Sequence, residues 1–138
     1  MTSIRTIFLI RHARSTANVD PAVYLRVPDP RIPLAAPDDD PGALRAARLV
    51  RAELVAPDDV IDSAALCSWT SSYDRCRQTE ALVTRTLLGG ALGGLRRRES
   101  FLLREQEFGD WDGLTEDQVA RVDPQRVHKL TRLTDQQG

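Results

Sequence analysis

The sequence has little lysine, histidine and cysteine, and each shortage narrows the classes of protein that it can encode. Lys129 is the only lysine among 19 basic residues, and Cys67 and Cys76 have neither metal-ligand nor CxxC spacing. Apolar runs extend over only five or six residues, far too short to cross a bilayer. The N-terminus lacks the pattern of a signal peptide, so we expect reduced thiols, no membrane partner and a cytoplasmic location.

A strong net charge is also missing. The 19 basic side chains nearly balance 20 acidic ones, giving a formal net charge of -1 at pH 7. This balance provides no long-range field for nucleic acid, so we expect none as a partner, and any anion site has to be built locally. Arginine suits bidentate binding of phosphate, although gene base composition is the simpler explanation for most of the arginines.

The length of 138 residues predicts one domain over residues 1–138, or part of a larger one. Short apolar segments with the length of buried strands alternate with amphipathic stretches. The expected strands are residues 6–10, 64–69 and 98–103. The expected helices are residues 42–55, a helix capped by Ser71 or Ser72, and one near residues 116–122. This alternation predicts an α/β fold, a three-layer sandwich with a mostly parallel sheet.

Two segments between these elements read as loops. Residues 20–41 hold six prolines and five aspartates, so we expect an irregular excursion that rims a site. Asp38, Asp39 and Asp40 allow a cation site there, but a solvated acidic loop is favoured, because further oxygen ligands at defined spacing are missing. Residues 89–94 (GGALGG) resemble a phosphate loop only superficially, and a helix end with a flexible turn is the better interpretation.

The side chains best suited to phosphate chemistry follow the first expected strand. His12 stands where open α/β sheets collect reactive groups and where helix N-termini offer N–H groups to anions. A lone histidine there more often has a structural role, but its context changes the interpretation. Arg11, Asn18 and Arg75 can all point into the same crevice, and arginine forks suit a dianion.

Three separated segments resemble signatures of the histidine phosphatase superfamily, also called the phosphoglycerate mutase-like family. IRHARSTAN resembles the Arg-His-Gly signature with its downstream Asn, and SSYDRCRQTEA resembles the Ser-x-x-x-Arg-x-x-Gln-Thr-Ala helix start. LREQEFGDWDG resembles the Leu-x-Glu…Phe-Gly-x-Trp-x-Gly segment. The order and spacing agree from residue 7 to about residue 114, so the resemblance implies a phosphoglycerate mutase-like fold that is incomplete at its C-terminus.

The resemblance implies a phosphohistidine mechanism that needs no metal or cofactor. His12 attacks phosphorus in line, while Arg11, Arg75 and Asn18 hold the equatorial oxygens. The ring N–H of His12 that takes no part in attack is expected to donate to a backbone carbonyl or a hydroxyl. Glu105 resembles the proton donor of the family, and its alternative is a surface salt-bridge partner.

Other polar residues near the first motif keep two interpretations open. Ser15 either binds phosphate or caps the helix that opens at Ala17. Arg77 is turned away from Arg75 by roughly 200° on a helix, so we expect it to be solvated. Arg14 adds a cation near the pocket mouth, from which we hypothesise a preference for a polyanionic substrate.

The sequence departs from the family pattern at its C-terminal end. The family's second histidine, which walls the phosphate pocket, has no counterpart, and His128 is expected to be a surface residue. Truncation, a wall supplied by another polypeptide, or degeneracy each explain this. The first strand then has an open edge, which allows a homo-oligomer.

The leading function is hydrolysis of a phosphomonoester on a small phosphorylated substrate. A phosphoglycerate mutase-like phosphotransferase is the enzymatic alternative, and a catalytically degenerate phosphate-binding or interaction protein is the third.

Overall fold

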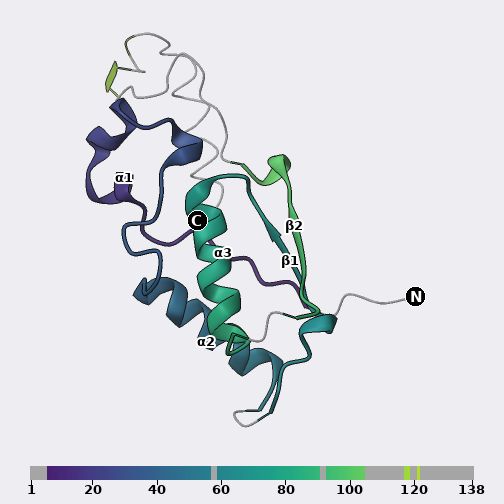
Figure 1. Cartoon of the computed structure of the whole chain (residues 1–138). Coiled ribbons are helices and arrows are strands. Elements are labelled where there is room, and N and C mark those ends of the chain that lie inside the picture. The colour runs from purple at the N-terminus through teal and green to yellow at the C-terminus, as the bar shows by residue number, and fades with distance from the viewer. Residues whose placement is uncertain (1–5, 57–58, 91–92, 105–116, 119–120, 122–138) are drawn as a thin grey trace. The chain divides into compact units, whose positions relative to one another are not determined.

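The computed structural model describes residues 6–56, 59–90, 93–104, 117–118 and 121 (Figure 1). The chain divides into two compact units, Met1–Arg104 and Glu105–Gly138. In the second unit, residues 117, 118 and 121 are helical, and the rest of the helix expected near residues 116–122 lies outside the described residues. The expectation of a single domain stays a prediction. All elements below belong to the first unit.

A β-α-β segment provides the parallel pairing. Strands β1 (Cys67–Thr70) and β2 (Arg96–Glu99) run parallel with Thr70 opposite Glu99, and helix α3 (Asp74–Leu87) connects them (Figure 1). Parallel strands need such a crossover, because a short hairpin cannot reverse the chain twice. The α/β class with parallel pairing is therefore confirmed, in a small two-stranded sheet as far as the described residues extend.

Both of these strands are shifted from their expected positions. The start of the expected strand 64–69 is a 3₁₀ turn, Ser63–Ala65, and the end of the expected strand 98–103 is another, Phe101–Leu103. Each turn begins after a side chain that accepts a backbone N–H: Asp62 accepts from Ala64, and Ser100 accepts from Leu102. Such local hydrogen bonds compete with strand pairing, and they shorten the strands here.

Helix α2 (Pro41–Leu54) packs against α3, and apolar side chains of the two helices form the core. The expected helix 42–55 is thus confirmed. Asp40 caps it by accepting from the N–H groups of Gly42 and Ala43, and Pro41 suits the first helical position. Asp40 is therefore a buried cap rather than part of a solvated loop. The buried core residues are Ala43, Ala47, Val50, Leu82, Val83 and Leu87.

The two ends of α3 are formed differently from each other. The N-cap is Tyr73, which makes no side-chain capping bond, so the expected cap by Ser71 or Ser72 is wrong. After the helix, Gly89 and Gly90 adopt φ of +58° and +87°, which glycine tolerates without strain. The expected helix end at the glycine-rich segment is confirmed.

The strand expected at residues 6–10 is not formed. Phe8 packs against the core, but Ile7 and Leu9 are 73% and 95% exposed, so this segment is not covered on both faces. A strand requires a backbone partner, and residues 6–10 make no backbone hydrogen bond with another described segment. The composition of residues 6–10 thus predicted a strand, but these residues do not pair with another described segment.

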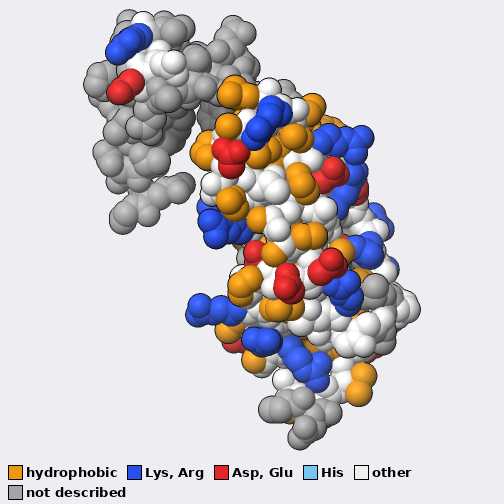
Figure 2. Space-filling view, turned by 60° about the vertical axis from the view of Figure 1, so that its left-hand side comes forward, with side chains coloured by type: hydrophobic (Ala, Val, Ile, Leu, Met, Phe, Trp, Pro, Cys, Tyr) orange, Lys and Arg blue, Asp and Glu red, His pale blue; other side chains and the backbone are white. Residues whose placement is uncertain are grey.

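Several charged side chains on the surface of this unit form ion pairs. Figure 2 shows basic and acidic side chains intermixed over one face. Arg77 donates to both carboxylate oxygens of Glu99 at 2.8 Å, and Arg97 pairs with Glu80.

Within the described part of the chain, both cysteines are free, and a helix long and apolar enough to span a membrane is not found.

Candidate functional site

His12 is partly buried, and one ring nitrogen already has a partner. Its Nδ1 lies 2.8 Å from the carbonyl oxygen of Ala13. A carbonyl oxygen only accepts, so Nδ1 carries the hydrogen and Nε2 keeps its lone pair in the neutral ring. This is the arrangement expected of a nucleophilic histidine.

The backbone after His12 is fastened to helix α3. The N–H of Ala13 donates to the hydroxyl oxygen of Thr79 at 2.9 Å, and that hydroxyl donates to the carbonyl oxygen of Arg75 at 2.7 Å. Thr79 is 4% exposed, so its bond to Arg75 is buried and its bond from Ala13 is partly shielded from water. The structure thereby joins the histidine loop to the helical turn that carries Arg75.

Gln78 holds the second loop that reaches this region. Its side-chain oxygen accepts the backbone N–H of Leu34 at 2.7 Å. Leu34 forms an isolated antiparallel bridge with Ser15, and the N–H of Thr16 donates to the carbonyl oxygen of Pro33 at 2.9 Å. Pro33 and Leu34 of the proline-rich excursion are thus attached to the segment that follows His12. The roles of Thr79 and Gln78 were missed, although both belong to the motif SSYDRCRQTEA.

Ser15 and Asn18 form a capping box on the short helix α1 (Thr16–Val19). The hydroxyl oxygen of Ser15 accepts the N–H of Asn18 at 3.2 Å, and the side-chain oxygen of Asn18 accepts from the N–H and the hydroxyl of Ser15. Of the two interpretations of Ser15, capping is the one observed. A role of either residue in phosphate binding stays a prediction.

Arg75 is held by the proline-rich excursion. Its guanidinium donates to the backbone oxygen and the carboxylate of Asp29, a residue of the 3₁₀ turn Asp29–Arg31. Its Cζ also lies 4.7 Å from the ring centroid of Tyr73. Burial lowers the pKa of Arg75, but the hydrogen bond with Asp29 and the charge interactions with Asp29, Cys76 and Tyr24 together raise that pKa above its usual value, so the side chain stays charged.

Three other arginines of the first two motifs, Arg11, Arg14 and Arg77, are exposed to solvent. Arg11 and Arg14 are exposed, and neither side chain makes an ion pair with a described residue. Arg77 is also solvent-accessible and pairs with Glu99 and Asp74, as expected for a residue turned away from Arg75. Whether Arg11 and Arg14 contact phosphate stays a prediction.

Two expected residues lie outside the described part of the chain: Glu105, the expected proton donor, and His128, the expected surface histidine.

Among the described residues, no cluster of three side chains suits a metal ion. Asp38 instead approaches Arg85 at 3.5 Å, and Asp40 caps α2.

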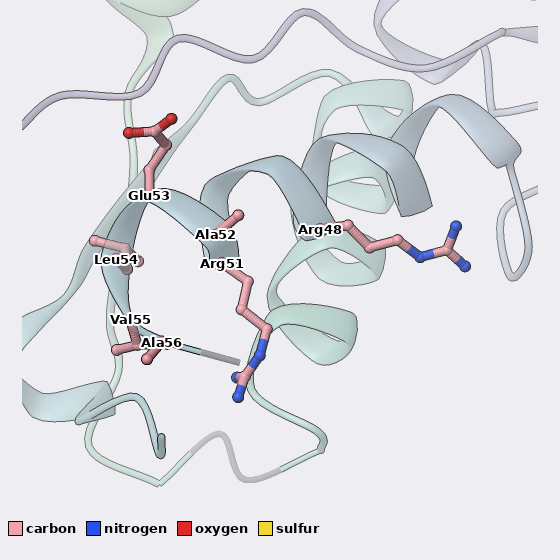
Figure 3. A pocket seen from close by; sticks show the side chains of 7 residues that line it. All are labelled: Arg48, Arg51, Ala52, Glu53, Leu54, Val55 and Ala56. Atoms are coloured by element: carbon pink, nitrogen blue, oxygen red, sulfur yellow. The ribbon is translucent and has the colours of Figure 1, made fainter. Parts of the chain in front are cut away.

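An open hollow lies at the C-terminal end of α2, lined by Arg48 and residues 51–56 (Figure 3). None of the phosphate-site candidates lines it. The guanidinium of Arg51 is used by the fold, because it donates to the carbonyl oxygen of Asp59 at 2.6 Å. This hollow is separate from the His12 region and supplies no chemistry to it.

Comparison with known proteins agrees with the three motifs. A sequence profile of the histidine phosphatase superfamily (branch 1) matches residues 7–137. The curated phosphoglycerate mutase-like protein AT74 of Arabidopsis thaliana is 32% identical over 111 residues, which are 78% of this chain and 33% of that protein. The chain therefore spans about a third of the length of this relative. No solved structure matches.

Proposed function

The chain belongs to the histidine phosphatase superfamily (branch 1), and from that premise we propose that it hydrolyses a phosphomonoester through a phosphohistidine on His12. The observation that carries the proposal is the 2.8 Å contact between Nδ1 of His12 and the carbonyl oxygen of Ala13. This contact directs the lone pair of a neutral imidazole to Nε2, which is what attack on phosphorus requires.

The first half of the proposed reaction transfers the phosphoryl group to the enzyme. Nε2 of His12 forms a bond to phosphorus as the bond to the ester oxygen breaks. The departing alkoxide takes a proton from Glu105. Arg11, Arg75 and Asn18 stabilise the charge that develops on the equatorial oxygens.

The second half returns the enzyme to its starting state. Water attacks the phosphorus and the bond to Nε2 breaks, so inorganic phosphate leaves and His12 is regenerated. The proton lost by water returns to Glu105, which completes its exchange of one proton per turnover. The substrate in this scheme is a small phosphorylated molecule.

A mutase-like phosphotransferase is the second candidate, because the Arabidopsis relative carries the name phosphoglycerate mutase-like. The same phosphohistidine then passes its phosphoryl group to an alcohol instead of water. The two candidates therefore differ only in the acceptor.

Radiolabelled acetyl phosphate tests the proposal. We expect acid-labile label on the wild-type chain and on His128→Gln, which removes the other histidine, but none on His12→Gln. Release of the label to water supports hydrolysis, and transfer to an added alcohol supports the mutase alternative. A folded wild-type chain that takes up no label would contradict both and favour a phosphate-binding protein.

We further propose a cytoplasmic location, supported by the free thiols of Cys67 and Cys76 in a parallel α/β unit. Fractionation of cells that express the tagged chain tests it. Recovery of the chain in a membrane or secreted fraction would overturn it.

A further inference from the structure

The ion pair between Asp29 and Arg75 holds a buried guanidinium, whereas the arginines of Arg26–Asp20 and Arg97–Glu80 are exposed. The Arg75 side chain is 3% exposed and that of Asp29 is 34% exposed. Exposed pairs such as Arg26–Asp20, with 66% and 54% of the side chains exposed, contribute little to stability or geometry. A buried guanidinium, in contrast, requires a partner, because an uncompensated buried charge is costly.

Asp29 fixes the guanidinium through three bonds. Nη1 of Arg75 donates to the backbone oxygen and to Oδ1 of Asp29, both at 2.8 Å, and Nη2 donates to Oδ2 at 3.3 Å. The ring of Tyr73 stacks on the face of the same group. An edge and a face of the guanidinium plane are therefore both constrained, which leaves the long side chain little rotational freedom.

The three bonds also join distant parts of the sequence. Asp29 and Arg75 are separated by 46 residues, and the bonds attach the 3₁₀ turn Asp29–Arg31 to the first turn of α3. Leu34, five residues further along the same excursion, is attached to α3 through Gln78. The position of Arg75 thus depends on the excursion of residues 20–41 as well as on its own helix.

We propose that Asp29 is a positioning residue for Arg75, an inference that rests on the proposed function, in which Arg75 binds the transferring phosphoryl group. Asp29 contacts the guanidinium and acts on phosphate only through it. A guanidinium group that is held in place before phosphate binds loses less conformational entropy on binding than a mobile one. The carboxylate therefore raises the affinity of the site for phosphate, despite its own negative charge.

A double-mutant cycle on the affinity for inorganic phosphate tests this role. We expect Asp29→Asn to weaken phosphate binding about tenfold, a usual size for coupling between contacting residues. In an Arg75→Gln background the same substitution is expected to change nothing, because the group that it positions is absent. A merely structural role of Asp29 would lower the melting temperature but would weaken phosphate binding equally in both backgrounds.

The matched control is Asp20→Asn, which removes another carboxylate of the same excursion, one that pairs with Arg26 at the surface. Its phosphate affinity is expected to equal that of the wild type. If Asp29→Asn does not fold, Asp29→Glu is measured instead. This variant keeps the negative charge but moves the carboxylate by one methylene, so the guanidinium of Arg75 is held in a different position. We expect that variant to bind phosphate more weakly too.

The outcomes separate this inference from the proposed function. Unchanged phosphate affinity in Asp29→Asn overturns the positioning role, and tighter binding overturns it as well, since the carboxylate would then compete with phosphate. Equal affinity of the wild type and Arg75→Gln overturns the role of Arg75 in the proposed function. A folded wild-type chain that binds no phosphate overturns both proposals.

Discussion

Thr79 and Ala13 are separated by 66 residues, and the hydroxyl oxygen of Thr79 accepts the backbone N–H of Ala13 at 2.9 Å. The same hydroxyl donates to the carbonyl oxygen of Arg75, so one side chain satisfies two backbone groups. A buried backbone N–H without an acceptor is costly, which makes this hydroxyl the anchor of the loop that carries His12.

Thr79→Val is expected to lower the free energy of unfolding by about 1–3 kcal/mol, because the N–H of Ala13 loses its acceptor. Thr79→Ser keeps the hydroxyl and loses one methyl group, so we expect a loss of about 1 kcal/mol or less. Urea unfolding measures both. Equal stability of the Val and Ser variants would show that the hydroxyl is not the anchor.

The helices could be predicted from the sequence because they depend on local patterns, and the parallel pairing because strand-like and helix-like segments alternate along the chain. The apolar spacing from Ala43 to Leu54 defines α2, and Gly89 ends α3 because it tolerates a positive φ. Residues 6–10 have the composition of a strand, but a strand also needs a partner, and partners are not encoded locally.

The motifs name His12 and Arg75 as candidates, whereas the bonds that connect their segments could not be predicted. The role of Thr79, for example, depends on a hydrogen bond across 66 residues. Asp29 is one of five aspartates in residues 20–41, and like Asp20 it precedes a proline, so its local sequence does not predict a buried partner. Only the folded chain shows that Asp29 meets a buried arginine.

Leu82→Ala is expected to destabilise the protein by about 2–5 kcal/mol, because Leu82 is 2% exposed between α2 and α3 and its truncation leaves a cavity. Leu49→Ala is the control, since Leu49 of α2 is 59% exposed. Its effect should stay within about 0.5 kcal/mol. Similar losses in the two variants in chemical denaturation would contradict this location of the core.

Asp40→Ala removes the cap of α2 and should cost about 1 kcal/mol of unfolding free energy, because the N–H groups of Gly42 and Ala43 lose their acceptor. Asp39→Ala changes an exposed neighbour that does not cap the helix, so we expect a change within about 0.5 kcal/mol. Thermal unfolding distinguishes the two, and an equal effect of both would exclude capping as the cause.

The ion pair between Glu99 and Arg77 predicts a dependence of stability on pH. The hydrogen bond from Arg77 lowers the pKa of Glu99, so the unfolded chain takes up a proton at a higher pH than the folded one. The stabilisation is present above the unfolded pKa of about 4.5 and is lost as the pH falls through the folded pKa.

Glu99→Gln should therefore melt below the wild type at pH 7, and the difference should shrink towards pH 3. Arg77→Gln removes the other partner and also the contact with Asp74, so it too is expected to melt below the wild type at pH 7. Melting temperatures across this range measure the effect. A difference that stays constant with pH would rule out ionisation of Glu99 as its source.

Gln78 and Thr79 are neighbours in α3, yet one holds Leu34 and the other holds Ala13. A small translation or rotation of α3 would consequently move the loops that contain Ala13 and Leu34 together. The position of the loop that carries His12 therefore depends on the position of α3.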